Sequence, residues 1–168
     1  MTGCDDVNGI VVGIDGSEAS RAALRWATDQ AHSLGTQVVA VHAWEAAPAA
    51  PYAPVAARPT PAAQRERAAE LLAATVRETF GPRVDPAVRA VLVEGPPARV
   101  LLQQAHSALL LALGLRRHGQ GELPAVGPVG RECLRHATVP VVTVPAHDRT
   151  TAPLRAVEDT AAVGKDVA

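Results

Sequence analysis

The sequence predicts an α/β fold in which a doubly wound parallel sheet carries helices on both faces. The first observation is that short apolar runs rich in valine and leucine, typical of strands covered on both sides, recur along the chain. The second is that segments of helical period lie between them. The strands are expected at residues 10–14, 38–41, 88–93, 109–113 and 139–144. The resulting order β-α-β-α-β-α-β-α-β favours parallel strands joined by right-handed crossovers.

The four predicted helices carry their own start and stop signals. Ser17 and Glu18 supply a cap and a first-turn acid for the first helix, and Gly35 is placed to end it. The apolar face of this helix is expected to include Leu34, and that of the second helix to include Leu71. The other three helices are expected from Thr60–Pro61 to Gly81–Pro82, from Pro96–Pro97 to about His106, and from Gly127–Pro128 to about His136.

Length and composition fit one domain with tails. The 168 residues, 48% of them hydrophobic, are enough to bury one core. We expect residues 8–145 to form the α/β domain, after an N-terminal tail of residues 1–7. Residues 146–168 lack a sustained period and are expected to form a disordered tail, and the proline-rich stretch 46–59 a semi-rigid connection.

Charge and residue usage exclude several classes of protein. Sixteen basic against seventeen acidic residues give a net charge of −1, which argues against a nucleic-acid binder. No apolar run approaches the roughly 20 residues that cross a bilayer. Residues 1–7 carry Asp5 and Asp6 and no basic start, so no secretion signal is expected. Cys4 and Cys133 form neither a disulfide framework nor a metal-ligand pattern, so no metal is predicted. The sequence therefore predicts a cytoplasmic protein with no membrane or nucleic-acid partner.

Ligands of open parallel sheets bind beyond the carboxyl ends of the strands. This rule selects three segments: residues 15–17 after the first strand, residues 43–45 after the second and residues 114–130 after the fourth. Asp15 follows the first strand, where its carboxylate can accept hydrogen bonds from an adenine amino group or a ribose hydroxyl; a turn residue or helix cap is the simpler interpretation. The glycine-rich stretch 114–130 runs into a helix start, a geometry that presents N–H groups to phosphate. It matches neither a P-loop nor the dinucleotide fingerprint, so a flexible loop is the alternative. His42, in the second strand, is assigned a structural or edge-facing position.

Five segments, in order, resemble the universal stress protein domain, particularly its actinobacterial members. They are IVVGIDGS at residues 10–17, AALRWA at 22–27, VHAW at 41–44, EGPPA at 94–98 and VPVV at 139–142. The resemblance covers about residues 8–145. It implies a Rossmann-like, five-stranded parallel sheet of order 3-2-1-4-5 with four helices, a homodimer, and a regulatory role in the stress response. Many members of this family also bind ATP.

The ATP-binding members carry the motif Gly-x2-Gly-x9-Gly-Ser/Thr, which this chain matches only in part. Aligned through the last strand, the motif falls on Gly114, Arg117, Gly127 and Pro128, so the second glycine and the hydroxyl residue are missing. The other nucleotide-contacting positions that the resemblance carries over are Gly13, Ile14, Asp15, Ala43, Leu113, Val129 and Gly130.

These departures predict weak or absent ATP binding. Pro128 lacks both a hydroxyl and an N–H, and two lost hydrogen bonds of about 0.5–1.5 kcal/mol each weaken affinity by roughly 5- to 150-fold. Arg117 can act in either direction, because its guanidinium can grasp a phosphate or its bulk can fill the space that a glycine leaves open. A solvated basic turn is the alternative interpretation of this position.

The last strand suggests how the chain associates with itself. In a sheet of order 3-2-1-4-5 the strand from Val139 to Val144 lies at an edge, and it carries no lysine or glutamate to block pairing. A two-fold homodimer that pairs this strand with its symmetry mate covers the edge, as the family resemblance also implies.

Three hypotheses for function follow. The first is a dimeric regulator that binds an adenine nucleotide. The second is a dimerising interaction module of the same fold whose nucleotide site has decayed, which the damaged motif favours by a modest margin. The third, a phosphoryl-transfer or hydrolytic enzyme, has little support, because the chain has no P-loop lysine, no recognisable base and no carboxylate pair for Mg²⁺. The sequence therefore predicts that the protein is not an enzyme, with very low ATPase activity at most.

Overall fold

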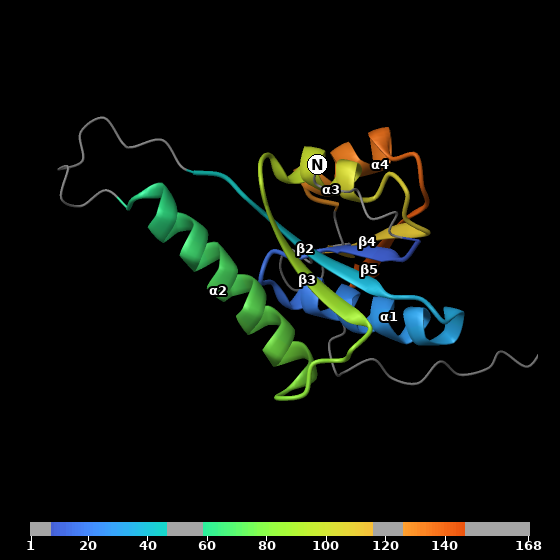
Figure 1. Ribbon diagram of the computed structural model, residues 1–168. Helices are drawn as coiled ribbons and strands as arrows, with labels where there is room; N and C mark the ends of the chain where they lie inside the picture. The colour runs from blue at the N-terminus through green and yellow to red at the C-terminus, as the bar shows by residue number, and fades with distance from the viewer. Residues whose placement is uncertain (1–7, 47–58, 116–125, 147–168) are drawn as a thin grey trace, which may run out of the picture.

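The computed structural model describes residues 8–46, 59–115 and 126–146, and the statements below concern these ranges (Figure 1). The whole predicted N-terminal tail, most of the predicted C-terminal tail and of the proline-rich connection, and Arg117 lie outside the described residues. The elements, in order, are β1 Ile10–Gly13, α1 Glu18–Leu34, β2 Val38–Trp44, α2 Pro61–Phe80, β3 Val88–Glu94, α3 Pro97–Gln104, β4 Leu110–Leu115, α4 Pro128–His136 and β5 Val141–Pro145. The predicted order of strands and helices is confirmed.

The five strands form one sheet of order β3-β2-β1-β4-β5, and every neighbouring pair is parallel. The predicted α/β fold and strand order are therefore confirmed. The central strand β1 pairs with β2 on one side and β4 on the other, so the chain changes direction across the sheet at β1. This is the topological switch point at which open α/β sheets bind ligands.

The helices cover the sheet in two layers, with α1 and α2 on one face and α3 and α4 on the other (Figure 1). Each face buries its own apolar cluster, and successive residues of a strand supply the two clusters in turn. Ile10 and Val12 of β1 pack under α1, whereas Val11 packs toward α3 and α4. Strands buried on both faces explain why the sequence shows continuous apolar runs.

The predicted starts of α1 and α2 are capped by the expected side chains. The Ser17 hydroxyl accepts a hydrogen bond from the Ser20 N–H at 3.1 Å, and the Thr60 hydroxyl accepts one from Ala63 at 3.2 Å. Gly35 ends α1 with a φ of 64°, in the left-handed region that favours glycine. None of the helices in the described ranges is both long enough and apolar enough to cross a membrane.

The structure corrects several details of the predicted elements. Leu34 is 60% exposed and Leu71 is 36% exposed, so neither belongs to a buried helix face. Leu34 is the last residue of α1, beyond Ala31, the last buried residue of the helix. The last strand begins at Val141 rather than at Val139, because its pairing with β4 starts opposite Leu111. β4 correspondingly runs on to Leu115 rather than ending at residue 113, opposite the end of β5.

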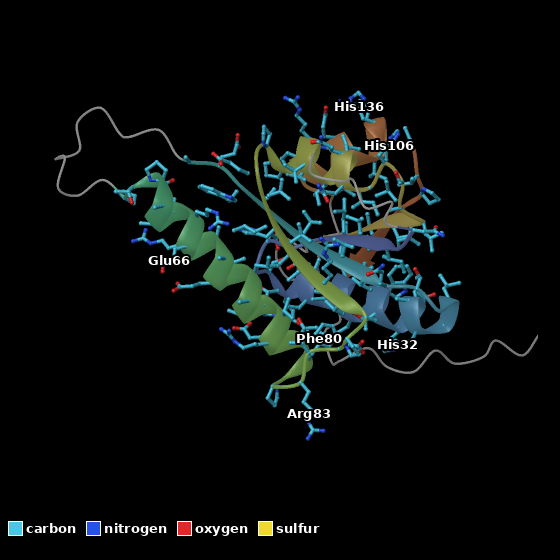
Figure 2. All side chains as sticks on the ribbon, in the orientation of Figure 1. His32, Glu66, Phe80, Arg83, His106 and His136 are labelled. Carbon is cyan, nitrogen blue, oxygen red and sulfur yellow. The ribbon has the colours of Figure 1, made fainter. Side chains whose placement is uncertain are left out.

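The second helix has a polar outer face, as its charged residues predict. Figure 2 shows Glu66 pointing away from the sheet, and the neighbouring Arg65, Arg67 and Glu70 are exposed too. At the other end of the helix, Phe80 packs against the core under α1 and α2. An ion-pair network joins α2 to α1 where they meet: Arg21 contacts Glu18 at 2.7 Å and Glu78 at 2.5 Å.

Candidate functional site

A cavity of about 380 Å³ opens where the carboxyl ends of the central strands meet the start of α4. Within the described ranges, its walls come from the ends of β1, β2, β4 and β5 and from the first turns of α1, α3 and α4. The volume lies near the lower end of the roughly 300–1,000 Å³ that is usual for small-molecule sites. The cavity therefore occupies the switch point of the sheet, where the topology predicts a ligand site.

The structure brings the sequence-predicted site residues together. All but one of the predicted site residues line this cavity. They are Gly13, Ile14 and Asp15 at the end of β1, Ala43 of β2, Leu113 and Gly114 of β4, and Gly127, Pro128, Val129 and Gly130 at the start of α4. The remaining predicted residue, Arg117, lies outside the described residues. The gathering is a finding about geometry, and the binding role of each residue stays a prediction.

Asp15 both caps the turn after β1 and lines the cavity. Its Oδ1 accepts hydrogen bonds from the Ser17 N–H at 3.0 Å and from the Ser17 hydroxyl at 2.5 Å. The same Ser17 oxygen accepts from the Ser20 N–H, so Asp15 orients the cap of α1. The Asx turn that sequence reasoning raised as the simpler interpretation is therefore present, and it holds the carboxylate in a fixed position at the cavity.

His42 is a cavity residue that sequence reasoning did not select. It lies on an interior strand, between β1 and β3, so of the two expected positions, structural or edge-facing, the edge-facing one is wrong. Its Nδ1 lies 2.7 Å from the Ile14 carbonyl oxygen, which can only accept, so Nδ1 carries the proton. This bond ties the end of β2 to the residue that precedes Asp15. The signal in the sequence was limited to a polar residue near the end of a buried strand.

Packing against backbone requires a glycine at position 114. A Cβ on Gly114 would lie 2.4 to 2.6 Å from the backbone of Ala19 and Ser20, because the first turn of α1 crosses directly over the end of β4. A Cβ on Gly13 would lie 2.9 Å from the end of the Leu113 side chain, which can move aside. Gly114 therefore lets α1 approach the sheet, whether or not a ligand is bound.

Gly127 is different, because neither packing nor backbone conformation requires a glycine there. Its φ of −66° and ψ of 174° suit any residue, and a Cβ would meet no atom of the described residues within 4 Å. It is the N-cap of α4, yet among the described residues no side chain caps this helix. Pro128 follows at the first helical position and has no N–H to offer. Val129 and Gly130 follow in the first turn, where N–H groups have no carbonyl partner within the helix. Both residues line the cavity, so their N–H groups are donors at its edge.

The described lining is nearly neutral. Asp15 is its one formally charged side chain, and His42 its one other titratable side chain, among the lining residues of the described ranges. Within those ranges no group of three or more histidine, cysteine, aspartate or glutamate side chains is arranged to hold a metal ion. Cys133 of α4 is fully buried, and burial raises the pKa of its thiol to about 11. A protonated, buried thiol is a packing group rather than a nucleophile.

The comparisons with known proteins agree on one family. The model of the universal stress protein family matches residues 7–145. The universal stress protein Rv2623 of Mycobacterium tuberculosis is 33% identical over 133 residues, which cover 79% of this chain and 43% of the relative. The chain therefore spans less than half of the length of this relative.

Solved structures of the family share the fold. The universal stress protein from Archaeoglobus fulgidus in complex with dAMP superposes with a TM-score of 0.58 at 22% identity, over 81% of this chain and 96% of that one. A universal stress protein family protein from Arabidopsis thaliana with AMP bound gives a TM-score of 0.53 at 18% identity, over 87% and 97% of the two chains. At these identities the likeness establishes the fold alone.

Proposed function

Because the chain belongs to the universal stress protein family, we propose that it is a homodimeric stress-response regulator that binds an adenine nucleotide in the cavity at the switch point. The observation that carries this proposal is that one cavity holds both the fixed Asp15 carboxylate and the uncapped start of α4. The carboxylate is an acceptor for the amino group or hydroxyls of a nucleoside. The helix start offers N–H donors and the positive end of its dipole to a phosphate.

The apolar walls between these two ends suit the base. Val41 and Ala43 of β2 and Leu113 of β4, the strands on either side of β1, line the cavity. An aromatic ring ligand gains by leaving water against such side chains. Two relatives of the same fold carry dAMP or AMP in their solved structures, which supports an adenine nucleotide as the ligand class.

ATP is expected to bind weakly, because the phosphate end of the cavity is short of donors. Pro128 contributes neither an N–H nor a hydroxyl at the first turn of α4. Among the described lining residues no side chain has a permanent positive charge, and Asp15 adds a negative one. Arg117, which stands where the ATP-binding members carry the second motif glycine, lies outside the described residues, and the proposal for weak binding does not depend on it.

The self-association part of the proposal rests on β5. Among the described strands, β5 pairs with β4 alone and is an edge of the sheet. The Leu111 N–H bonds the Pro140 carbonyl at 2.9 Å, so in a parallel ladder residues 142 and 144 also turn their polar groups toward β4. Val141 and Thr143 consequently direct their backbone groups to the outer edge, where a symmetry-related strand can pair.

No catalytic activity is proposed. The Asp15 carboxylate is engaged by Ser17, and no second carboxylate lines the described part of the cavity to hold a metal or serve as a base. The alternative function is an interaction module of the same fold without a nucleotide, and the proline at the α4 start is the observation that favours it. Cytoplasmic location stays a prediction.

Calorimetric titration of the purified protein with AMP, ATP and adenosine tests the proposal. Saturable binding of at least one of them, weakened by Asp15→Asn, is the expected result. Asp15→Asn retains an oxygen acceptor for the Ser17 N–H and removes the charge, so the turn after β1 is kept. If none of the three ligands binds at millimolar concentration, the nucleotide proposal is wrong and the interaction module is the better account. Light scattering on the same sample tests the dimer, and a monomer contradicts it.

A further inference from the structure

Thr143 is a polar residue in an otherwise apolar strand. β5 reads Val-Val-Thr-Val-Pro, and its neighbours Val142 and Val144 pack with the core beneath α1 and α2. Because side chains alternate along a strand, Thr143 projects from the opposite face, the side of α3 and α4 where Val141 packs. The cavity lies on that side, and Thr143 lines it.

The register places Thr143 beside the start of α4. Thr143 pairs with Leu113 of β4, which also lines the cavity. A Cβ on Gly130 of α4 would lie 3.9 Å from the same Leu113 side chain. Thr143 and the first turn of α4 are therefore both neighbours of Leu113 at one cavity.

The Thr143 hydroxyl is unused by the protein within the described ranges. No hydrogen bond joins it to another described residue. The hydroxyl is also not fully buried, because in the described part of the chain no buried side-chain nitrogen or oxygen atom lacks a hydrogen-bond partner. A half-buried hydroxyl that has no protein partner and lines a cavity is available to a ligand.

We propose that Thr143 is a ligand-binding residue, whose hydroxyl donates a hydrogen bond to a phosphoryl oxygen of the bound nucleotide. The inference rests on the proposed nucleotide function and adds a residue from the edge strand to it. The α4 start presents the N–H groups of Val129 and Gly130, while Pro128 presents none. A phosphoryl group has more acceptor oxygens than two N–H groups can saturate, and the hydroxyl from β5 supplies a third donor.

A plain solvated threonine is the competing explanation. Threonine is favoured in strands for its β-branched shape, and its hydroxyl can be satisfied by water at a sheet edge. The two explanations differ in what removal of the hydroxyl does to ligand affinity, because a solvated hydroxyl makes no contact with the phosphate.

Calorimetry with AMP and adenosine on Thr143→Val tests the proposal. Valine keeps the β-branched shape and removes only the hydroxyl, so the strand is retained. The expected result is a loss of about 10- to 100-fold in AMP affinity, the range for a hydrogen bond to a charged group, with adenosine affinity changed by less than about twofold. Thr143→Ser, which keeps a hydroxyl, should retain most of the AMP affinity. Thr143→Ala provides a second hydroxyl deletion if the valine variant is unstable.

The matched control is Thr138→Val, the same substitution at an exposed residue that lies outside the cavity lining. It should leave both affinities unchanged. Wild-type AMP affinity in Thr143→Val overturns the inference while leaving the proposed function intact, and an equal loss for adenosine overturns the phosphate assignment. Absence of AMP and adenosine binding to the wild-type protein overturns the proposed function and this inference with it.

Discussion

Replacing Gly127 should move stability and ligand affinity in opposite directions. The position is the N-cap of α4, has the extended backbone that caps adopt, and leaves open space where a Cβ would stand. In Gly127→Asp the carboxylate can accept a first-turn N–H and lies at the positive end of the helix dipole. Capping adds a few tenths of a kcal/mol over glycine and the charge about 0.3–1 kcal/mol, so the free energy of unfolding should rise by about 0.5–1.5 kcal/mol.

The same carboxylate should oppose a phosphate at the cavity. Two unit charges about 4 Å apart repel by about 1 kcal/mol in water and about 4 kcal/mol at the effective dielectric of a protein surface. AMP affinity should therefore fall by roughly 5-fold to several hundred-fold, beyond any loss that comes from the added side chain itself. Adenosine, which has no phosphate, should lose much less.

Gly127→Asn is the matched control, because asparagine caps a helix as well as aspartate does and carries no charge. Urea denaturation measures the stability of both variants, and calorimetry measures their AMP and adenosine affinities. The difference in AMP affinity between the two variants isolates the charge. Equal AMP affinities in the aspartate and asparagine variants would refute the assignment of a phosphate to the α4 start. A drop in stability in both would refute the claim that glycine is not required there.

Three further predictions follow from packing and from the sheet edge. Gly114→Ala should lower the free energy of unfolding in urea by about 1–3 kcal/mol, because its methyl group meets the α1 backbone; unchanged stability would contradict the close approach of α1 to β4. Val141→Pro removes an outward-facing N–H from the edge strand and should convert the dimer to a monomer in light scattering, whereas a dimer that persists places the interface elsewhere. In a Cys4→Ser background, Cys133 should resist thiol reagents at pH 8 until urea unfolds the protein, since burial raises the pKa of its thiol to about 11. Rapid labelling of the native protein would contradict that burial.

Most of the fold could be predicted from the sequence because each element carries a local signal. Ser17 and Gly35 mark the ends of α1 through side-chain and backbone geometry that needs no tertiary contact. The boundaries of β4 and β5 could not be predicted in the same way. They are set by how far the two strands pair, from Leu111 opposite Val141 to Leu115 opposite Pro145. Pairing length is a tertiary property, and local propensity does not encode it.

The candidate site shows a similar division. Asp15 and the residues around Gly127 could be selected because strand ends and helix starts of an open parallel sheet converge. His42 and Thr143 could not, since each is a single polar residue within an apolar run, where it is usually a packing or solvated residue. Their relevance depends on the carbonyl of Ile14 in one case and on the register with Leu113 in the other. Both are relations between strands that are distant in the sequence.

The glycines of the family motif carry unequal information about binding. Gly114 is required by the approach of α1 to β4, so it is expected in any member packed this way, with or without a ligand. Gly127 has no such structural reason among the described residues, because a Cβ there would meet none of their atoms, and Gly127 lines the cavity. A match at the first position therefore cannot separate a nucleotide binder from an interaction module of the same fold. The distinction depends on Gly127 and on the N–H and hydroxyl donors that Pro128 lacks. It also depends on whether a residue outside the motif, such as Thr143, supplies the missing donor.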